Sequence, residues 1–272
     1  MFTNKVILIT GASSGLGKNM ALNYAKQGGR IINVSRDVGR MQRLNEQLNK
    51  LNSRENLFYS VDVSKYDEIV KIKNTMINDH KIQPDIIVNN AAGNFLCPFE
   101  NLSENGWKRV IDIVLNGSFN ITHVFGKDMI RTKKKGVFLN ISTTYADNSS
   151  ALVIPSGVAK TGVDNMMKGL TVEWAKYGIR FVGIAPGPIE GSGGVGKLDP
   201  LGLFKYYTKY TNPSGRYCDP DEISKLAMFL TSKDGDYING EIVRIDGGEL
   251  IKNSGEFNFI TNIPFYDNLF KK

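Results

Sequence analysis

The sequence reads Thr10-Gly11-Ala12-Ser13-Ser14-Gly15-Leu16-Gly17 directly after the apolar run Val6–Ile9, and a helix-length segment follows. Glycine lets the backbone turn tightly and approach a ligand closely. The free N–H groups of the first helical turn then face an anion. We therefore expect a dinucleotide pyrophosphate to be held by Gly11, Ser13, Ser14, Gly15, Leu16 and Gly17. The alternative is a tight strand-to-helix turn of the same composition without a ligand.

Short apolar runs and helix-length segments alternate along the rest of the chain. Such alternation predicts an α/β fold, in which a parallel sheet is covered by helices on both faces. We expect one domain over residues 1–272, a Rossmann-type doubly wound sheet of about seven strands. The predicted strands are Val6–Ile9, Ile31–Val34, Leu57–Val61, Ile86–Val88, Val137–Ile141, Phe181–Ile184 and Ile242–Ile245, and the clearest helices are Lys18–Lys26, Asp67–Asn78 and Val158–Ala175.

Composition excludes several classes of protein. With 272 residues, 41% of them hydrophobic, the chain can bury the core of one large domain. No apolar stretch approaches the roughly 20 residues of a membrane-spanning helix, and we expect a cytoplasmic protein without a membrane partner. Two cysteines and two histidines make a disulfide framework or a metal site improbable. The formal charge of +7 suits anionic ligands. The basic run 131–135 is expected in a solvated loop, and no nucleic-acid-binding module surrounds it.

Two segments depart from the alternating pattern. The glycine-rich segment 189–216 is interpreted as a substrate lid, with a flexible surface connection as the alternative. The segment 250–272 is rich in phenylalanine and tyrosine. We expect these aromatic side chains to pack within or between subunits.

The end of the second predicted strand bears on the choice of cofactor. It reads Val34-Ser35-Arg36, without the carboxylate that would accept the 2′-hydroxyl of an NAD ribose. The guanidinium of Arg36 suits a 2′-phosphate instead. NADP(H) is therefore favoured over NAD(H), the alternative being that Arg36 is only an exposed charge.

Several motifs together carry a family resemblance. They are the glycine turn, Asn89-Asn90-Ala91-Ala92-Gly93, Lys160 on the helix after the fifth strand, Pro186-Gly187-Pro188-Ile189 and Asp246-Gly247-Gly248. Over nearly its whole length the chain resembles the short-chain dehydrogenase/reductase family. The resemblance implies further cofactor contacts at Asp62, Val63, Asn90, Ala91, Lys160, Pro186, Gly187 and Ile189.

One position departs from the family pattern. Ser156 stands four residues before Lys160, where the family normally carries its catalytic tyrosine, and Tyr145 lies fifteen residues before the lysine. Thr143 takes the place of the family serine, and Val114 that of its asparagine. This pattern resembles a narrower group, the NADPH-dependent 2,4-dienoyl-CoA reductases of mitochondria and peroxisomes. Further residues that carry this resemblance are Asn89 to Phe95, Asp112 to Gly117, Thr143 to Ala146, Glu173-Trp174, Lys176 to Gly178 and Leu198-Asp199-Pro200.

The resemblance implies a role for each displaced group. Tyr145 and Asn94 would bind the thioester oxygen, Lys160 the nicotinamide ribose, and Ser156 would fill the vacated place with a small hydroxyl. In a 2,4-dienoyl thioester the hydride goes to C5, far from the carbonyl oxygen, so a phenol supplied from the end of a strand would suit that oxygen. The alternative for Tyr145 is a partly buried loop residue whose hydroxyl meets the backbone.

The resemblance also implies a substrate and an assembly. Acyl-CoA would contact Phe95, Ser103 and Lys197. Lys197 stands in place of the usual arginine, and a lysine cannot make the bidentate contact of a guanidinium. The leading hypothesis is NADPH-dependent reduction of 2,4-dienoyl-CoA to 3-enoyl-CoA in the oxidation of unsaturated fatty acids, by a homotetramer. The alternatives are another short-chain reductase acting on 3-oxoacyl or 2-enoyl thioesters, and a non-catalytic NADP(H)-binding sensor.

Overall fold

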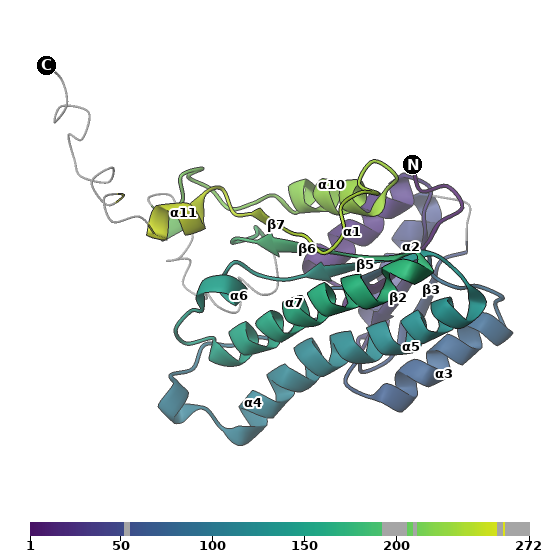
Figure 1. Ribbon diagram of the computed structural model, residues 1–272, viewed down its shortest axis with the longest axis horizontal. Helices are drawn as coiled ribbons and strands as arrows, with labels where there is room; N and C mark the ends of the chain where they lie inside the picture. The colour runs from purple at the N-terminus through teal and green to yellow at the C-terminus, as the bar shows by residue number, and fades with distance from the viewer. Residues whose placement is uncertain (52–54, 192–205, 209–210, 255–257, 259–272) are drawn as a thin grey trace, which may run out of the picture.

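Seven parallel strands form one sheet in the order β3-β2-β1-β4-β5-β6-β7 (Figure 1). The computed structural model describes residues 1–51, 55–191, 206–208, 211–254 and 258. The strand order reverses between β1 and β4, which creates the crevice at the carboxyl ends where doubly wound sheets bind ligands. The strands are β1 (Val6–Thr10), β2 (Arg30–Ser35), β3 (Leu57–Ser60), β4 (Ile86–Asn89), β5 (Gly136–Ile141), β6 (Ile179–Pro186) and β7 (Ile242–Ile245).

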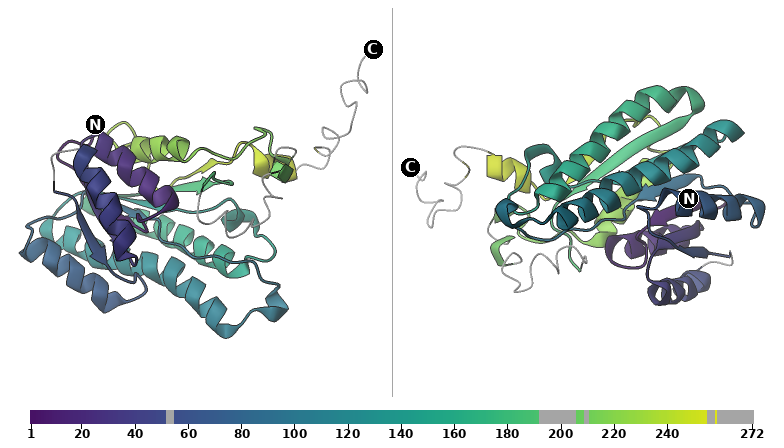
Figure 2. Two further views of the ribbon diagram at one scale, coloured as in Figure 1. Left: turned by 180° about the vertical axis from the view of Figure 1, so that it is seen from behind. Right: turned by 90° about the horizontal axis from the view of Figure 1, so that it is seen from below.

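Helices cover both faces of the sheet, because successive side chains of each strand point to opposite faces. In β1, Ile7 and Ile9 join the core beneath α1, α2 and α10, whereas Leu8 joins the core beneath α3, α5 and α7. The two helical layers lie on opposite sides of the sheet in the left view of Figure 2. Strands enclosed in this way need apolar residues on both faces, as the sequence provides. The layers consist of α1 (Gly15–Lys26), α2 (Val38–Leu51) and α10 (Pro220–Thr231), and of α3 (Tyr66–Asn78), α5 (Gly117–Thr132) and α7 (Ile154–Trp174).

The predicted fold class and all seven predicted strands are confirmed, while several boundaries move. The first helix begins at Gly15, inside the glycine turn, and α7 begins at Ile154 with Pro155 in its first turn, a position where proline is favoured. The prediction of a loop at 131–135 is wrong for residues 131 and 132, which belong to α5. Arg131 pairs with Asp128 at 2.6 Å and so extends α5 to Thr132.

Short helical elements that the sequence pattern did not reveal position the site. The chain from α4 to α5 passes through one π-helical turn, η2, and Val114 is buried within it. Turns of this kind are frequent at functional sites. Another short element, α6, follows β5 directly and begins at Tyr145. These elements are η1 (Phe99–Asn101), α4 (Glu104–Ile111), η2 (Asp112–Asn116), α6 (Tyr145–Asn148), η3 (Ala175–Tyr177) and α11 (Glu249–Ser254).

Two predicted segments fall partly outside the described residues. The proposed lid, 189–216, is described only at 189–191, 206–208 and 211–216, and Lys197 lies outside the described residues. The proposed aromatic extension, 250–272, is described as far as residue 254, where α11 ends, and at residue 258. Both segments stay predictions. Across the helices of the described residues, none combines the length and apolar character needed to cross a membrane.

Candidate active site

The turn between β1 and α1 has room only for glycine at its critical positions. Gly11 and Gly15 have φ values of 69° and 54°, in the left-handed region that favours glycine. A Cβ atom at Gly11 would lie 3.1 Å from Cα of Ala91, and one at Gly17 would lie 2.5 Å from Nδ2 of Asn90. The turn therefore packs directly against the loop that follows β4.

The side chain of Thr10 joins these two loops. Its Oγ1 donates to the carbonyl of Val88 at 3.3 Å and accepts from the N–H groups of Asn90 and Ala91 at 3.0 and 2.9 Å. In turn, Nδ2 of Asn90 donates a hydrogen bond to the Thr10 carbonyl at 2.9 Å. The site fits a dinucleotide here, because the N-cap residue Ser14 makes no side-chain cap and leaves the N–H groups of α1 for an anion. Sequence reasoning took Thr10 as the first residue of the glycine turn and missed it as a site residue, because its contacts are with residues about 80 positions away.

The other residues expected at the cofactor also lie at or near the carboxyl ends of strands. Ser13 donates its N–H to Oγ of Ser35 at 3.3 Å, which ties the glycine turn to β2. Gly187 donates its N–H to the Ile245 carbonyl at 3.0 Å, just after Pro186 ends β6. The buried residues among those expected at the cofactor include Leu16, Gly17, Pro186 and Ile189.

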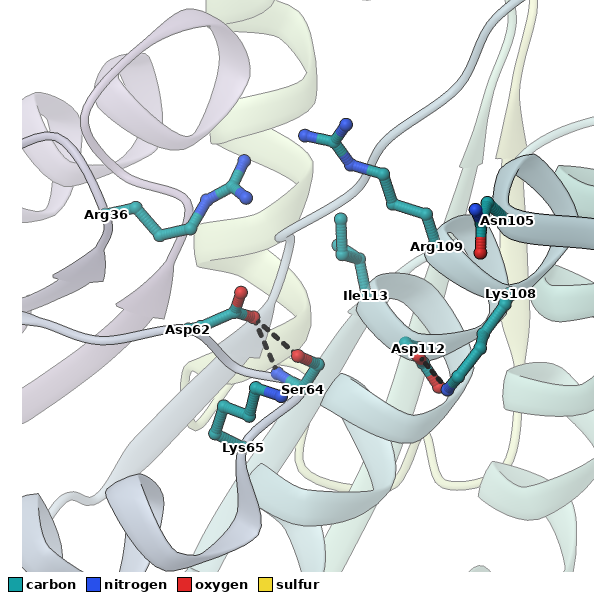
Figure 3. A pocket seen from close by; sticks show the side chains of 9 residues that line it. All are labelled: Arg36, Asp62, Ser64, Lys65, Asn105, Lys108, Arg109, Asp112 and Ile113. Carbon is teal, nitrogen blue, oxygen red and sulfur yellow. Dashed lines mark hydrogen bonds and ion pairs between the residues drawn. The ribbon is translucent and has the colours of Figure 1, made fainter.

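Arg36 and Asp62 follow the ends of β2 and β3 and line one cavity, which appears in Figure 3. Oδ1 of Asp62 accepts from N–H and O–H of Ser64 at 3.0 and 2.8 Å. Burial favours the neutral form of Asp62, but the Ser64 hydrogen bonds and the charges of Arg36 and Lys65 lower its pKa overall. Val63 is buried, and its side chain leaves room only for a glycine at Gly117, where a Cβ atom would lie 2.7 Å from Cγ2 of Val63.

Asn94, Tyr145 and Ser156 come together at the carboxyl edge of the sheet. Oδ1 of Asn94 accepts the N–H of Phe95 at 2.9 Å, which turns the amide nitrogen toward the phenol. Nδ2 of Asn94 donates to the Tyr145 hydroxyl at 3.2 Å. The same hydroxyl lies 3.1 Å from Oγ of Ser156. Both partners of this phenol are side chains, whereas the alternative interpretation expected the backbone.

Two bonds to neighbouring loops hold this arrangement. Thr161 of α7 donates from Oγ1 to the Ala146 carbonyl at 2.7 Å, which fixes α6 on α7. The N–H of Cys97 donates to the Leu152 carbonyl at 2.9 Å, which ties the loop after β4 to the loop before α7. Residues from three separate parts of the chain are thereby held at one point.

Lys160 lies one helical turn beyond Ser156, so both side chains share one face of α7. Its side chain is buried, and Nζ donates to the Ile141 carbonyl. Burial lowers the pKa of Lys160 to about 8, although the charge of Asp164 acts to raise it. A neutral lysine thus becomes accessible near physiological pH.

Asp164 is a buried group that sequence reasoning missed. Burial raises its pKa, while a 2.5 Å hydrogen bond from the Ser142 hydroxyl and the charge of Lys160 oppose that change. Its other oxygen, Oδ1, is buried and has no hydrogen-bond partner among the described residues. The sequence feature that could have indicated Asp164 is its position four residues, about one helical turn, after Lys160.

Two of the three residues expected at acyl-CoA, Phe95 and Ser103, come together at the start of α4. Ser103 is the N-cap of α4, and its hydroxyl accepts the N–H of Gly106 at 3.1 Å. The ring of Phe95 reaches the same turn, since a Cβ atom at Gly106 would lie 3.0 Å from its Cζ. Both residues therefore lie on the Asn94 side of the site, and the hydroxyl of Ser103 has a capping role in the fold.

A model of the short chain dehydrogenase family matches residues 5–199. This chain belongs to the short-chain dehydrogenase family. The members of this family are oxidoreductases that use a nicotinamide cofactor, so this chain is an oxidoreductase whose fold binds such a cofactor. The family resemblance inferred from sequence is confirmed.

Individual relatives in the family extend over most of the chain. A probable 2,4-dienoyl-CoA reductase of Bacillus subtilis (strain 168), described as (2E)-enoyl-CoA-producing, is 39% identical over 246 residues, covering 90% of this chain and 96% of that protein. A probable 2,4-dienoyl-CoA reductase of Caenorhabditis elegans, described as (3E)-enoyl-CoA-producing, is 33% identical over 256 residues, covering 93% and 83%. The crystal structure of a short chain dehydrogenase from Bacillus anthracis has a TM-score of 0.82 and 41% identity, covering 90% of this chain and 96% of that one.

Proposed function

We propose that the chain is an NADPH-dependent 2,4-dienoyl-CoA reductase that forms a 3-enoyl-CoA in the oxidation of unsaturated fatty acids. The observation that carries the proposal is the phenol of Tyr145, bound by the amide of Asn94, with Ser156 in the place that family members normally give to tyrosine. The names of the Bacillus subtilis and Caenorhabditis elegans relatives support the same substrate class.

Bound NADPH supplies a hydride, which goes to C5 of the conjugated thioester. Negative charge then develops on the thioester oxygen, at the other end of the conjugated system. Tyr145 can donate its O–H to that oxygen. The Asn94 amide oxygen accepts the N–H of Phe95, so the amide nitrogen faces the site, and Asn94 can donate its second N–H to the same oxygen. Each such donor contributes about 2.7–4 kcal/mol to lowering the barrier.

The distance between the hydride target and the oxygen explains why the phenol is displaced. In ketone reduction both atoms belong to one carbonyl group, so a proton donor about 3 Å from that oxygen must also lie close to the hydride donor. In a dienoyl thioester four carbon–carbon bonds separate C5 from the carbonyl carbon. A phenol supplied from the start of α6 would meet that requirement, and Ser156 puts a small buried hydroxyl in the position of the usual tyrosine.

Lys160 and Arg36 would hold the two ends of the cofactor. The ammonium of Lys160 would bind the hydroxyl groups of the nicotinamide ribose, and its charge would strengthen nearby donors. The guanidinium of Arg36, at the end of β2, suits the 2′-phosphate that distinguishes NADPH from NADH. Cα and amide groups of the glycine turn would face the pyrophosphate, as the left-handed Gly11 and Gly15 permit.

The proposal is tested by the loss of NADPH absorbance with 2,4-hexadienoyl-CoA, measured beside acetoacetyl-CoA and crotonyl-CoA. We expect the dienoyl thioester to be turned over fastest. Turnover of acetoacetyl-CoA alone would favour a 3-oxoacyl reductase, and turnover of crotonyl-CoA alone a 2-enoyl reductase. Binding of NADPH without turnover of any of the three would favour a sensor.

The position of the remaining double bond needs its own measurement. Protonation at C2 gives the 3-enoyl product that we propose, whereas protonation at C4 gives a 2-enoyl product, and the two relatives differ in this respect. Nuclear magnetic resonance of the product distinguishes them, and a 2-enoyl product would correct this part of the proposal.

The assembly and the location of the protein complete the proposal. We expect a homotetramer, which a native mass of four chains would support and a monomer mass would contradict. We expect a cytoplasmic location, which fractionation of the producing cells tests.

A further inference from the structure

A cavity of about 270 Å³ lies beyond the carboxyl ends of β2 and β3. Arg36 and the loop after β3 form one wall, and α4 with the π-helical turn forms the other (Figure 3). Arg109 extends from the second wall toward Arg36, and Ile113, one helical turn further along, lines the cavity beside it.

The charges around this cavity are unbalanced. Its cations are Arg36, Lys65, Lys108 and Arg109, against the two carboxylates Asp62 and Asp112, which leaves two positive charges.

Both carboxylates already have partners. Oδ2 of Asp112 lies 2.6 Å from Nζ of Lys108, and its Oδ1 accepts from Nδ2 of Asn116 at 2.9 Å. The hydrogen bond from Lys108 is the main cause that lowers the pKa of Asp112, so this carboxylate stays charged and bound to the lysine. Asp62 is held by Ser64.

Three cations of the cavity, Arg36, Lys65 and Arg109, are left without an ion pair among the described residues, and the two arginines extend toward each other from opposite walls. Within the part of the chain that the structure describes, neither guanidinium forms an ion pair. Two cations that face one cavity repel each other, and an anion bound between them would offset this electrostatic repulsion. A guanidinium also presents paired N–H donors that match the oxygens of a phosphate.

We propose that Arg109 binds the 2′-phosphate of the cofactor adenosine from the wall opposite Arg36, and thereby helps to select NADPH. The inference rests on the proposed use of NADPH and adds a second group, from α4, to the one at the end of β2. The pyrophosphate is not the anion concerned, because the glycine turn that would hold it lies at the end of β1. Arg109 thus acts as a specificity-determining residue.

Binding of two nucleotides to the full chain tests this without any turnover. Adenosine 2′,5′-bisphosphate carries the 2′-phosphate, and adenosine 5′-monophosphate lacks it. Titration calorimetry with Arg109→Gln should show about tenfold weaker binding of the bisphosphate and unchanged binding of the monophosphate. Arg36→Gln should behave in the same way. The control is Arg244→Gln, which removes one arginine from the exposed edge strand β7 and should change neither affinity.

Three results would overturn the inference, and they differ in what else they affect. If Arg36→Gln weakens bisphosphate binding and Arg109→Gln does not, only the role of Arg109 is wrong. If Arg109→Gln weakens both nucleotides equally, the side chain contacts the adenine or supports the wall, and selects nothing. If the unaltered chain binds the bisphosphate no more tightly than the monophosphate, the proposed use of NADPH fails as well.

Discussion

The hydroxyl of Tyr145 meets side chains from two other parts of the chain, Asn94 after β4 and Ser156 in α7. Sequence reasoning found these three residues because each lies at a short, countable distance along the chain from Lys160 or from the glycine-containing motif after β4. It missed Asp164 and Arg109, whose significance depends on neighbours distant in sequence, namely Ser142 and Arg36. Contacts of that kind become visible only when the sheet brings strand ends together.

Tyr145→Phe and Ser156→Ala separate the displaced phenol from the hydroxyl in its usual place. Loss of the Tyr145 hydroxyl removes a donor to the thioester oxygen and should lower kcat about 100- to 1,000-fold with 2,4-hexadienoyl-CoA. Ser156→Ala should lower it less than about tenfold, because Asn94 still holds the phenol. Steady-state kinetics check both. The reverse order of severity would show that Ser156 is the essential hydroxyl.

Asp164→Asn should shift the alkaline limb of the pH profile. Lys160 loses its proton as the pH rises through about 8, so activity that requires the ammonium falls above that pH. Asp164 acts to raise the pKa of the lysine, so its neutral replacement should move the fall to lower pH. The measurement is kcat as a function of pH.

Glu173→Gln is the matched control for that substitution, since Glu173 is an exposed carboxylate on the same helix. It should leave the alkaline limb in place. An unmoved limb in Asp164→Asn would mean that Lys160 does not limit activity in this range, or that Asp164 does not influence it.

At the scale of elements, sequence patterns located helices and strands well where apolar spacing was long and regular. They missed α6 and the π-helical turn, which are too short for periodicity and are fixed by contacts such as the bond from Thr161 to the Ala146 carbonyl. They also placed Arg131 in a loop, because a basic run says nothing about its ion pair with Asp128.

Gly17→Ala tests the contact between the β1–α1 turn and the loop after β4. The added Cβ atom would lie 2.5 Å from Nδ2 of Asn90 and 2.6 Å from the Gly11 carbonyl oxygen, so the backbone must shift. We expect a loss of about 1–3 kcal/mol in the free energy of unfolding, and weaker binding of NADP⁺. Urea denaturation and calorimetric titration measure the two effects.

Gly169→Ala on α7 provides the comparison, because a Cβ atom there would meet no described residue within 4 Å apart from the backbone of its own helix. Alanine in a helix interior should raise the free energy of unfolding by about 0.5–1 kcal/mol. If Gly17→Ala proved as harmless as Gly169→Ala, the close approach of the two loops would not hold in solution.

At the scale of the whole molecule, the strand order follows from rules that the sequence already obeys. Alternating strands and helices predict a parallel sheet, and right-handed crossovers with a reversal beside β1 bring the ends of β1, β4, β5 and β6 to one edge. The cofactor turn, Asn94, Tyr145 and Lys160 are thereby assembled at that edge. What the sequence could not provide is the direction of each side chain, such as the rotation of the Asn94 amide toward the phenol.

The position of hydride transfer is the most direct measure of the central claim, that the displaced phenol serves conjugate reduction. NADPH that carries deuterium at the transferred position of C4 of the nicotinamide would be reacted with 2,4-hexadienoyl-CoA, and the product examined by nuclear magnetic resonance. We predict that deuterium appears at C5 of the acyl chain. Deuterium at C3, or no transfer to the dienoyl thioester while acetoacetyl-CoA is reduced, would contradict the account.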